Sequence, residues 1–205
     1  MTATTPSRRK LTLNDIADLR AYERERPDFR ARVIEIKRRR RIEMGTFVTV
    51  MFENRDTMRL QVQEMARVEK TITDAGIQEE LDAYNPLIPE PGQLCATLFI
   101  ELTSDESMRE WLPRLVGIER SVVVRLADGS EIRGAVDPVH ASQLTRSEVT
   151  AAVHYMTFDF TPEQVQSFGY GTVVLAIDHP AYREEIELAQ TTVDELLKDL
   201  RPDPD

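Results

Sequence analysis

Residues 94–102 read LCATLFIEL, a nearly continuous run of apolar side chains in the middle of the chain. Such a run is typical of a β-strand that is covered on both faces. The clearest hairpin signal follows it, because the segments 121–126 and 131–136 flank the turn pair Asp128-Gly129. Further strands are predicted at 149–160 and 172–177, and a last helix from Pro180 to about residue 200. The C-terminal half is therefore predicted to be strand-rich and largely antiparallel, with a C-terminal helix.

The residues before this run favour helices. A short helix is predicted up to about Glu23, and Pro27 suits the first position of a second helix. Asn54 and Thr73 are expected to cap two more helices, while the β-branched and aromatic residues at 46–52 predict one strand. Together these segments predict an α+β fold, with a mainly helical half at residues 1–92 packed on the strand-rich half at 93–205. We expect the two halves to form one compact unit.

The single cysteine, Cys95, excludes several classes of protein. An intrachain disulfide, a zinc site built from cysteines and a self-contained iron–sulfur cluster all need more than one thiol. No apolar stretch approaches the roughly 20 residues that span a bilayer, and the N-terminal residues lack the charged-then-apolar order of a signal peptide. The sequence therefore predicts a cytoplasmic protein, with Cys95 as an inert, buried thiol.

Positive charge is concentrated in a basic N-terminal arm. Residues 1–41 hold 13 Lys and Arg against 6 Asp and Glu, whereas the whole chain has a formal net charge of −10. The run KRRRR at 37–41 is expected in the last turn of a helix, where cations complement the helix dipole. Its arginines are candidates for contact with a protein partner or with a second copy in a homo-oligomer. These candidates are Arg38, Arg39, Arg40 and Arg41.

Two other interpretations of the arginine run stay open. The basic arm can pack on the acidic body of its own chain. It can also bind nucleic acid, although the run lacks the interleaved aromatic residues that stack on bases. Because four consecutive residues point all round a helix axis, we expect at least one or two of the arginines to remain exposed.

A polar segment after the strand at 46–52 is a candidate ligand site. Glu53, Asn54, Gln61 and Glu64 are placed to converge near the start of a helix, with His154 as a further candidate. The alternative is that these residues cap the helix and carry solvated charge. One plausible histidine and scattered carboxylates make no recognisable set of metal ligands, so we predict no bound metal and no cofactor.

Several stretches of the sequence carry a family resemblance. They are FRARVI at 29–34, the basic run, FENRDT at 52–57, QEM at 63–65, Tyr84-Asn85 with Ile88-Pro89, ATL at 96–98 before Glu101, the strand around His154-Tyr155, and HPAY at 179–182. Over nearly its whole length the chain resembles the bacterial domain-of-unknown-function family 3501. The family has no assigned activity and no agreed catalytic residues. Its genes commonly lie beside those for rubrerythrin and for an iron–sulfur heterodisulfide-reductase-like protein.

The resemblance implies a partner rather than a reaction. We expect a cytoplasmic accessory protein, not itself an enzyme, that assists a redox or peroxide-defence system through protein–protein contacts. The implied partner is a rubrerythrin-like protein or an iron–sulfur oxidoreductase. One alternative is a metal- or ligand-binding enzyme that uses Glu53, Asn54 and Glu64 with His154. A second alternative is a nucleic-acid binder that uses Arg38 to Arg41.

Overall fold

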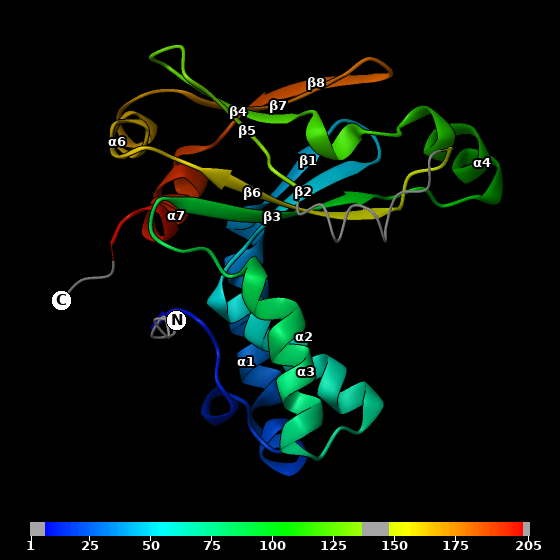
Figure 1. Cartoon of the computed structure of the whole chain (residues 1–205), viewed down its shortest axis with the longest axis vertical. Helices are drawn as coiled ribbons and strands as arrows, with labels where there is room; N and C mark the ends of the chain where they lie inside the picture. The colour runs from blue at the N-terminus through cyan, green and yellow to red at the C-terminus, as the bar shows by residue number, and fades with distance from the viewer. Residues whose placement is uncertain (1–6, 137–147, 203–205) are drawn as a thin grey trace, which may run out of the picture.

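Two four-stranded antiparallel sheets form the body of the molecule in the computed structural model, which describes residues 7–136 and 148–202 (Figure 1). Sheet A has the strand order β1-β2-β3-β6. Its strands are β1 (Arg41–Met44), β2 (Val48–Glu53), β3 (Gln93–Ile100) and β6 (Val153–Asp159). Sheet B has the order β5-β4-β7-β8. Its strands are β4 (Val122–Leu126), β5 (Glu131–Arg133), β7 (Val173–His179) and β8 (Tyr182–Glu187).

The apolar run of the sequence forms β3, an inner strand of sheet A. It pairs antiparallel with β2 on one side and with β6 on the other. Successive side chains of a strand point to opposite faces, and on both faces β3 is buried, as at Leu94 and Leu98 in the core and at Cys95 and Thr97 behind it. The prediction of a strand covered on both faces is confirmed.

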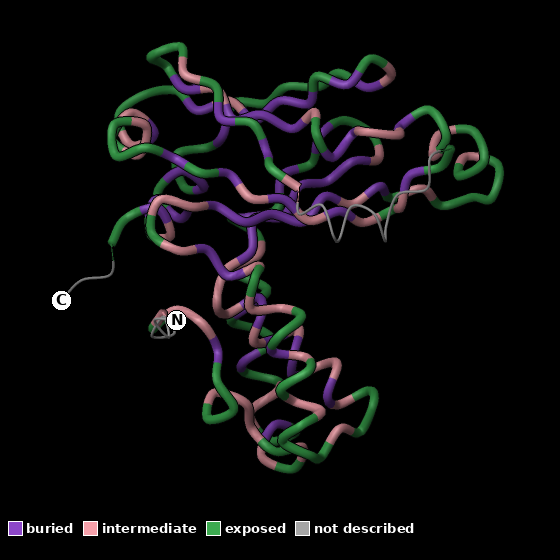
Figure 2. Tube along the Cα trace, viewed as in Figure 1, coloured by how far each residue is buried: buried purple, intermediate pink, exposed green. Residues whose placement is uncertain are grey.

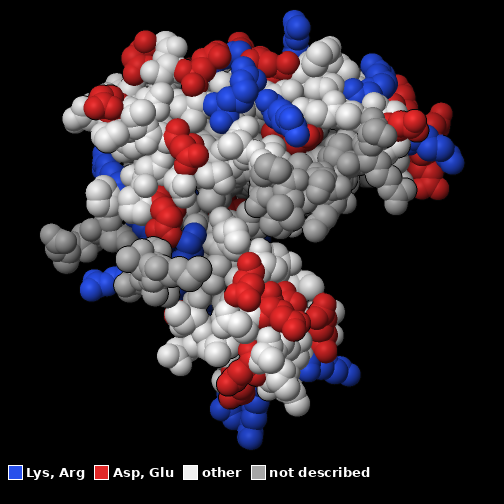
Figure 3. All heavy atoms as spheres, viewed as in Figure 1, with Lys and Arg blue, Asp and Glu red and all other residues white. Residues whose placement is uncertain are grey.

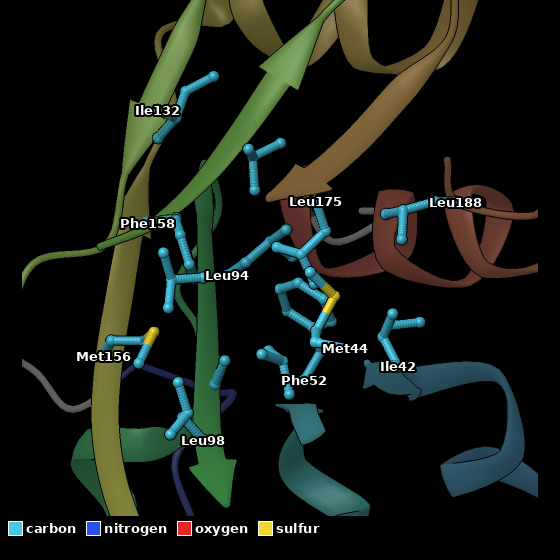
Figure 4. Packing of buried hydrophobic residues seen from close by; sticks show 14 of the residues in the cluster. Ile42, Met44, Phe52, Leu94, Leu98, Ile132, Met156, Phe158, Leu175 and Leu188 are labelled. Carbon is cyan, nitrogen blue, oxygen red and sulfur yellow. The ribbon is translucent and has the colours of Figure 1, made fainter. Parts of the chain in front are cut away.

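The main hydrophobic core lies between the two sheets (Figure 4). Phe52, Leu98 and Phe158 of sheet A share this core with Ile132 and Leu175 of sheet B. The strands carry most of the buried positions of the molecule, as the purple segments of Figure 2 show. Because sheet A takes β1 and β2 from before residue 92 and β3 and β6 from after it, both halves of the chain contribute to this core.

Three helices, here called the stalk, project from sheet A (Figure 1). They are α1 (Leu19–Arg40), α2 (Arg55–Glu69) and α3 (Asp74–Tyr84). Asn54 and Thr73 cap α2 and α3 as predicted, each accepting a hydrogen bond from a backbone N–H of the first turn. The chain passes from α1 directly into β1, since Arg40 ends the helix and Arg41 begins the strand. Figure 3 shows acidic side chains grouped on the viewed face of the stalk.

The prediction of two helices separated near Pro27 was wrong. Pro27 lies inside the single helix α1. A proline in this position leaves the carbonyl of Glu23 without its helical donor. Both residues are exposed, so water can hydrate that carbonyl and the helix continues.

The prediction that the last helix starts at Pro180 was also wrong. Residues Tyr182–Glu187 form β8, which pairs with β7 from His179↔Tyr182 to Val174↔Glu187. The C-terminal helix is the shorter α7 (Gln190–Leu200), which packs against α1, β3 and the helix α6 (Pro162–Tyr170). Helix α4 (Asp105–Arg114) follows β3. Within the described ranges, no helix has the length and apolar character needed to cross a bilayer.

Candidate functional site

The four arginines of the basic run diverge in the structure. The side chain of Arg40 is only 1% exposed. Its guanidinium donates to Asp199 Oδ2 at 2.6 Å, to Glu195 Oε1 at 3.2 Å and to the backbone oxygen of Glu53 at 3.5 Å. Arg40 thus joins the end of α1 to α7 and β2 inside the molecule, and it is not part of the protein surface.

Arg38, Arg39 and Arg41 remain exposed. Arg38 pairs with Glu35 at 2.8 Å and Arg41 with Glu101 at 2.6 Å, with side chains 70% and 42% exposed. Exposed ion pairs of this kind contribute about 0–1 kcal/mol. Either arginine can therefore exchange its intramolecular carboxylate for one on another molecule at little cost.

Arg38 and Arg41 line a groove of about 530 Å³ between β1 and β8, here called the edge groove. β1 is one edge strand of sheet A, and β8 is one edge strand of sheet B. The apolar residues of the groove are Ile42, Ile186, Leu188 and Ala189, and its polar residues are Arg38, Arg41, Glu43, Glu187 and Thr192. The apolar residues form the floor of the groove, and the guanidinium groups of Arg38 and Arg41 lie at its rim. This arrangement suits an extended protein segment that carries both apolar and acidic side chains.

The predicted ligand candidates do not meet at one site. Glu53 is buried on the outer face of sheet A, where its carboxylate accepts hydrogen bonds from Thr57 Oγ1 at 2.7 Å and Thr97 Oγ1 at 2.8 Å. Asn54 Oδ1 accepts from the backbone N–H of Thr57 as the cap of α2. Gln61 donates to the Tyr84 hydroxyl at 3.4 Å. These contacts support the capping interpretation of the segment.

Glu64 connects two helices of the stalk through hydrogen bonds. It accepts hydrogen bonds from Tyr22 Oη at 2.6 Å and from Arg26 Nε at 2.7 Å. Its bond with Arg26 lowers the pKa of Glu64 to about 2, while burial and the same carboxylate raise the pKa of Tyr22. The three residues link α1 to α2.

His154 lies on the opposite face of sheet A from Glu53. It is paired with Leu98 and faces the core between the sheets, where Nε2 is 2.9 Å from both Thr150 Oγ1 and the carbonyl oxygen of Ala151. Burial lowers the pKa of His154, and the nearby carboxylate of Glu119 partly opposes this shift. In residues 7–136 and 148–202, no three His, Cys, Asp or Glu side chains are grouped in a way that could hold a metal ion.

Two parts of the site were missed by reasoning from the sequence. Ile186 and Leu188 were assigned to a helix, so their place in the edge groove was not predicted. Thr97 was detectable in principle, since it alternates with the core residues Ala96 and Leu98 along β3.

Comparison with known proteins gives a family and a fold. A family model described as "Protein of unknown function (DUF3501)" matches residues 10–200. The chain is also similar to a crystal structure described as a novel protein of unknown function from Burkholderia pseudomallei K96243. The sequence identity is 34% and the TM-score is 0.85, over 93% of this chain and 99% of that chain. No curated protein matches.

Proposed function

The chain belongs to the DUF3501 protein family, and from this premise we propose that it is a cytoplasmic accessory protein that binds a redox enzyme through the edge groove. The partner we propose is the rubrerythrin-like protein or the iron–sulfur oxidoreductase that the family's gene neighbourhood implies. The accessory protein would hold or position this partner in a peroxide-defence system without carrying the redox centre itself.

The edge groove is the observation that supports this proposal. It combines apolar side chains, exposed Arg38 and Arg41, and the free edges of two sheets. Apolar contacts supply affinity, and arginines give directional pairing with carboxylates of a partner. Edge strands can in addition offer backbone hydrogen bonds to an extended segment.

The alternative functions have less support. Nucleic-acid binding through all four arginines conflicts with the burial of Arg40, and Glu43 and Glu187 place negative charge in the same groove. An enzyme site built from Glu53 and His154 conflicts with their positions on opposite faces of sheet A.

The test measures, by isothermal titration calorimetry, binding of a purified rubrerythrin-like protein and of a purified iron–sulfur heterodisulfide-reductase-like protein from the same organism. We expect the variant Arg38→Glu/Arg41→Glu to bind its partner at least tenfold more weakly than the wild type. The matched control is Arg24→Glu/Arg30→Glu, which makes the same charge change at exposed positions of α1 outside the groove. Ile186→Asp should weaken binding as well, because it places a charge on the apolar floor.

The salt dependence of binding separates the contribution of the arginines to affinity from that of the apolar residues of the groove. Wild-type affinity should fall between 50 and 300 mM salt, and the fall should be smaller for Arg38→Glu/Arg41→Glu, because screening acts on exposed charges. The proposal is wrong if neither partner binds the wild type, or if the groove variant and the control bind equally well.

A further inference from the structure

The segment that joins α2 to α3, here called the tip loop (residues 68–74), lies at the far end of the stalk from the sheets (Figure 1). Val68 and Ile72 of this loop are 69% and 83% exposed, and they are the two most exposed aliphatic side chains in the described parts of the chain. Beside the loop lies a hollow of about 160 Å³, whose apolar lining includes Leu13, Ile16 and Ile77. Neighbouring exposed apolar side chains of this kind mark an interaction surface.

Exposed negative charge accompanies these apolar side chains. Glu69 and Asp74 are exposed, and neither is paired with a Lys or Arg among the described residues. Asp18 and Asp74 line the hollow beside the loop, and no described Lys or Arg lines it. Lys70 is the one cation of the tip loop. The loop therefore presents aliphatic side chains together with two carboxylates and a single amine.

The edge groove has the complementary composition. Its floor is apolar, and Arg38 and Arg41 are exposed at its rim. The aliphatic side chains of the tip loop can be buried on this floor, and the two carboxylates of the loop can accept forked hydrogen bonds from the guanidinium groups. Glu43 and Glu187 of the groove offer carboxylates to the lysine of the loop.

A chain cannot place its tip loop in its own edge groove. Asp18 caps the outer end of α1 and lines the same hollow as Ile72, whereas Arg38 lies 20 positions further along the same helix. At a rise of 1.5 Å per residue these two positions are about 30 Å apart. Because α1 is one continuous helix, the stalk cannot fold back on itself. The tip loop that reaches the groove must therefore come from a second copy.

We propose that two copies of this chain associate head to tail, with the tip loop of one copy seated in the edge groove of the other. The apolar side chains supply the burial, and the charges set the orientation of the loop in the groove. This contact occupies the groove that we propose for the redox partner, so partner binding and self-association compete. The inference does not depend on the proposed function, because the tip loop and the groove belong to the same chain.

The test is sedimentation velocity over a series of protein concentrations. We expect the wild type to associate reversibly, and Ile72→Asp and Ile186→Asp each to lower the association constant at least tenfold. The matched control is Tyr170→Asp, because Tyr170 is 88% exposed on α6 and lines neither the hollow nor the edge groove. A wild type that stays monomeric up to about 1 mM overturns the proposal and leaves the groove open to the redox partner. Equal association of the wild type and Ile72→Asp also overturns it.

Mixing the two variants tests whether the contact joins the tip loop to the groove. Ile72→Asp keeps an intact groove and Ile186→Asp keeps an intact tip loop, so an equimolar mixture should form dimers that neither variant forms alone. A mixture that stays monomeric while the wild type associates overturns the proposal, because the contact then joins two tip loops or two grooves.

A charge-reversal pair gives an independent version of the same test. Arg38→Glu/Arg41→Glu and Glu69→Arg/Asp74→Arg should each associate weakly alone, since like charges then face each other. Mixed together they should associate again, because the reversed loop meets the reversed groove. Circular dichroism checks that each variant is folded. Failure of the mixed charge-reversal variants to associate, with both folded, overturns the proposal.

Discussion

Replacing Arg40 with Met tests whether the buried end of the basic run holds the stalk to the body. Methionine keeps most of the length and apolar character of the arginine stem but removes the guanidinium. The change leaves the carboxylates of Glu195 and Asp199 without their shared cation, at contacts that measure 3.2 and 2.6 Å in the wild type. We expect the variant to fold with a clearly lower free energy of unfolding.

The size of the stability loss depends on the partners and the solvent exposure that each carboxylate retains. Removing one partner of a buried ion pair costs about 3–5 kcal/mol. Glu195 retains Lys198 at 2.7 Å, and the Asp199 side chain is 12% exposed, so the lower end of this range applies. A loss of about 3 kcal/mol corresponds to a decrease in Tm of roughly 6–12 °C for a chain of this size.

The loss should depend on pH in a defined direction. Burial raises the pKa of Asp199 even with Arg40 present. Without Arg40 this pKa rises further, and a group whose folded pKa is raised stabilises the fold at low pH and loses that effect as pH increases. The difference between the variant and the wild type should therefore be smaller at pH 5 than at pH 8.

The assay is urea unfolding followed by circular dichroism at both pH values. The control is Arg39→Met, in which an exposed arginine 3.8 Å from Glu195 is removed, and its effect should stay within about 0.5 kcal/mol. The triple variant Arg40→Met/Glu195→Gln/Asp199→Asn should recover most of the loss, because it leaves no buried carboxylate without a cation, and the Lys198 that it unpairs is 65% exposed. A loss below about 1 kcal/mol in Arg40→Met, or no recovery in the triple variant, would refute this reasoning.

Three further predictions concern single positions. Because the pKa of Glu64 is lowered to about 2, the free energy of unfolding of the wild type should fall as the pH decreases from 4.5 toward 2. In urea unfolding, Glu64→Gln should show a flatter pH dependence over that range, and a parallel decline in both proteins would contradict this prediction. Burial raises the pKa of Cys95 to about 11, so native protein should react slowly with a water-soluble maleimide at pH 7, and stoichiometric labelling within minutes would show an accessible thiolate. Gly45→Ala should lower the free energy of unfolding in urea by about 1–3 kcal/mol, because φ is +76° at this position and the added Cβ would lie 2.5 Å from the Tyr182 hydroxyl. A free energy of unfolding equal to that of the wild type would contradict this prediction.

Local signals predicted much of the fold. The apolar run at 94–102, the pair Asp128-Gly129 and the cap Asn54 each act within a few residues, and each gave the correct element. β8 was misassigned because an outermost strand with exposed Glu184, Glu185 and Glu187 lacks the alternating pattern of a half-buried strand. The hairpin of β7 and β8 turns at Pro180-Ala181, which lacks the Asn-Gly or Asp-Gly signal that identified the other hairpin.

The candidate site depends on contacts between segments that lie far apart in the sequence. The sequence drew attention to four adjacent arginines, and their angular spacing predicted correctly that some stay exposed. It did not reveal that Arg40 is the buried one, because this depends on where α7 packs against the end of α1. The edge groove likewise exists only once β1 and β8 are brought together from opposite ends of the chain.

Because α1 continues directly into β1, a rotation of the stalk can be passed on to sheet A. Helix α1 has 22 residues and is therefore about 33 Å long. Arg40 holds the inner end of α1 to α7, and no residue separates α1 from β1, the strand that borders the edge groove. A sideways displacement of 3 Å at the far end of α1 would turn the helix by about 5°, given the rise of 1.5 Å per residue. Because β1 borders the edge groove, a force at the tip of the stalk that turned α1 and β1 together would change the width of that groove, about 33 Å away.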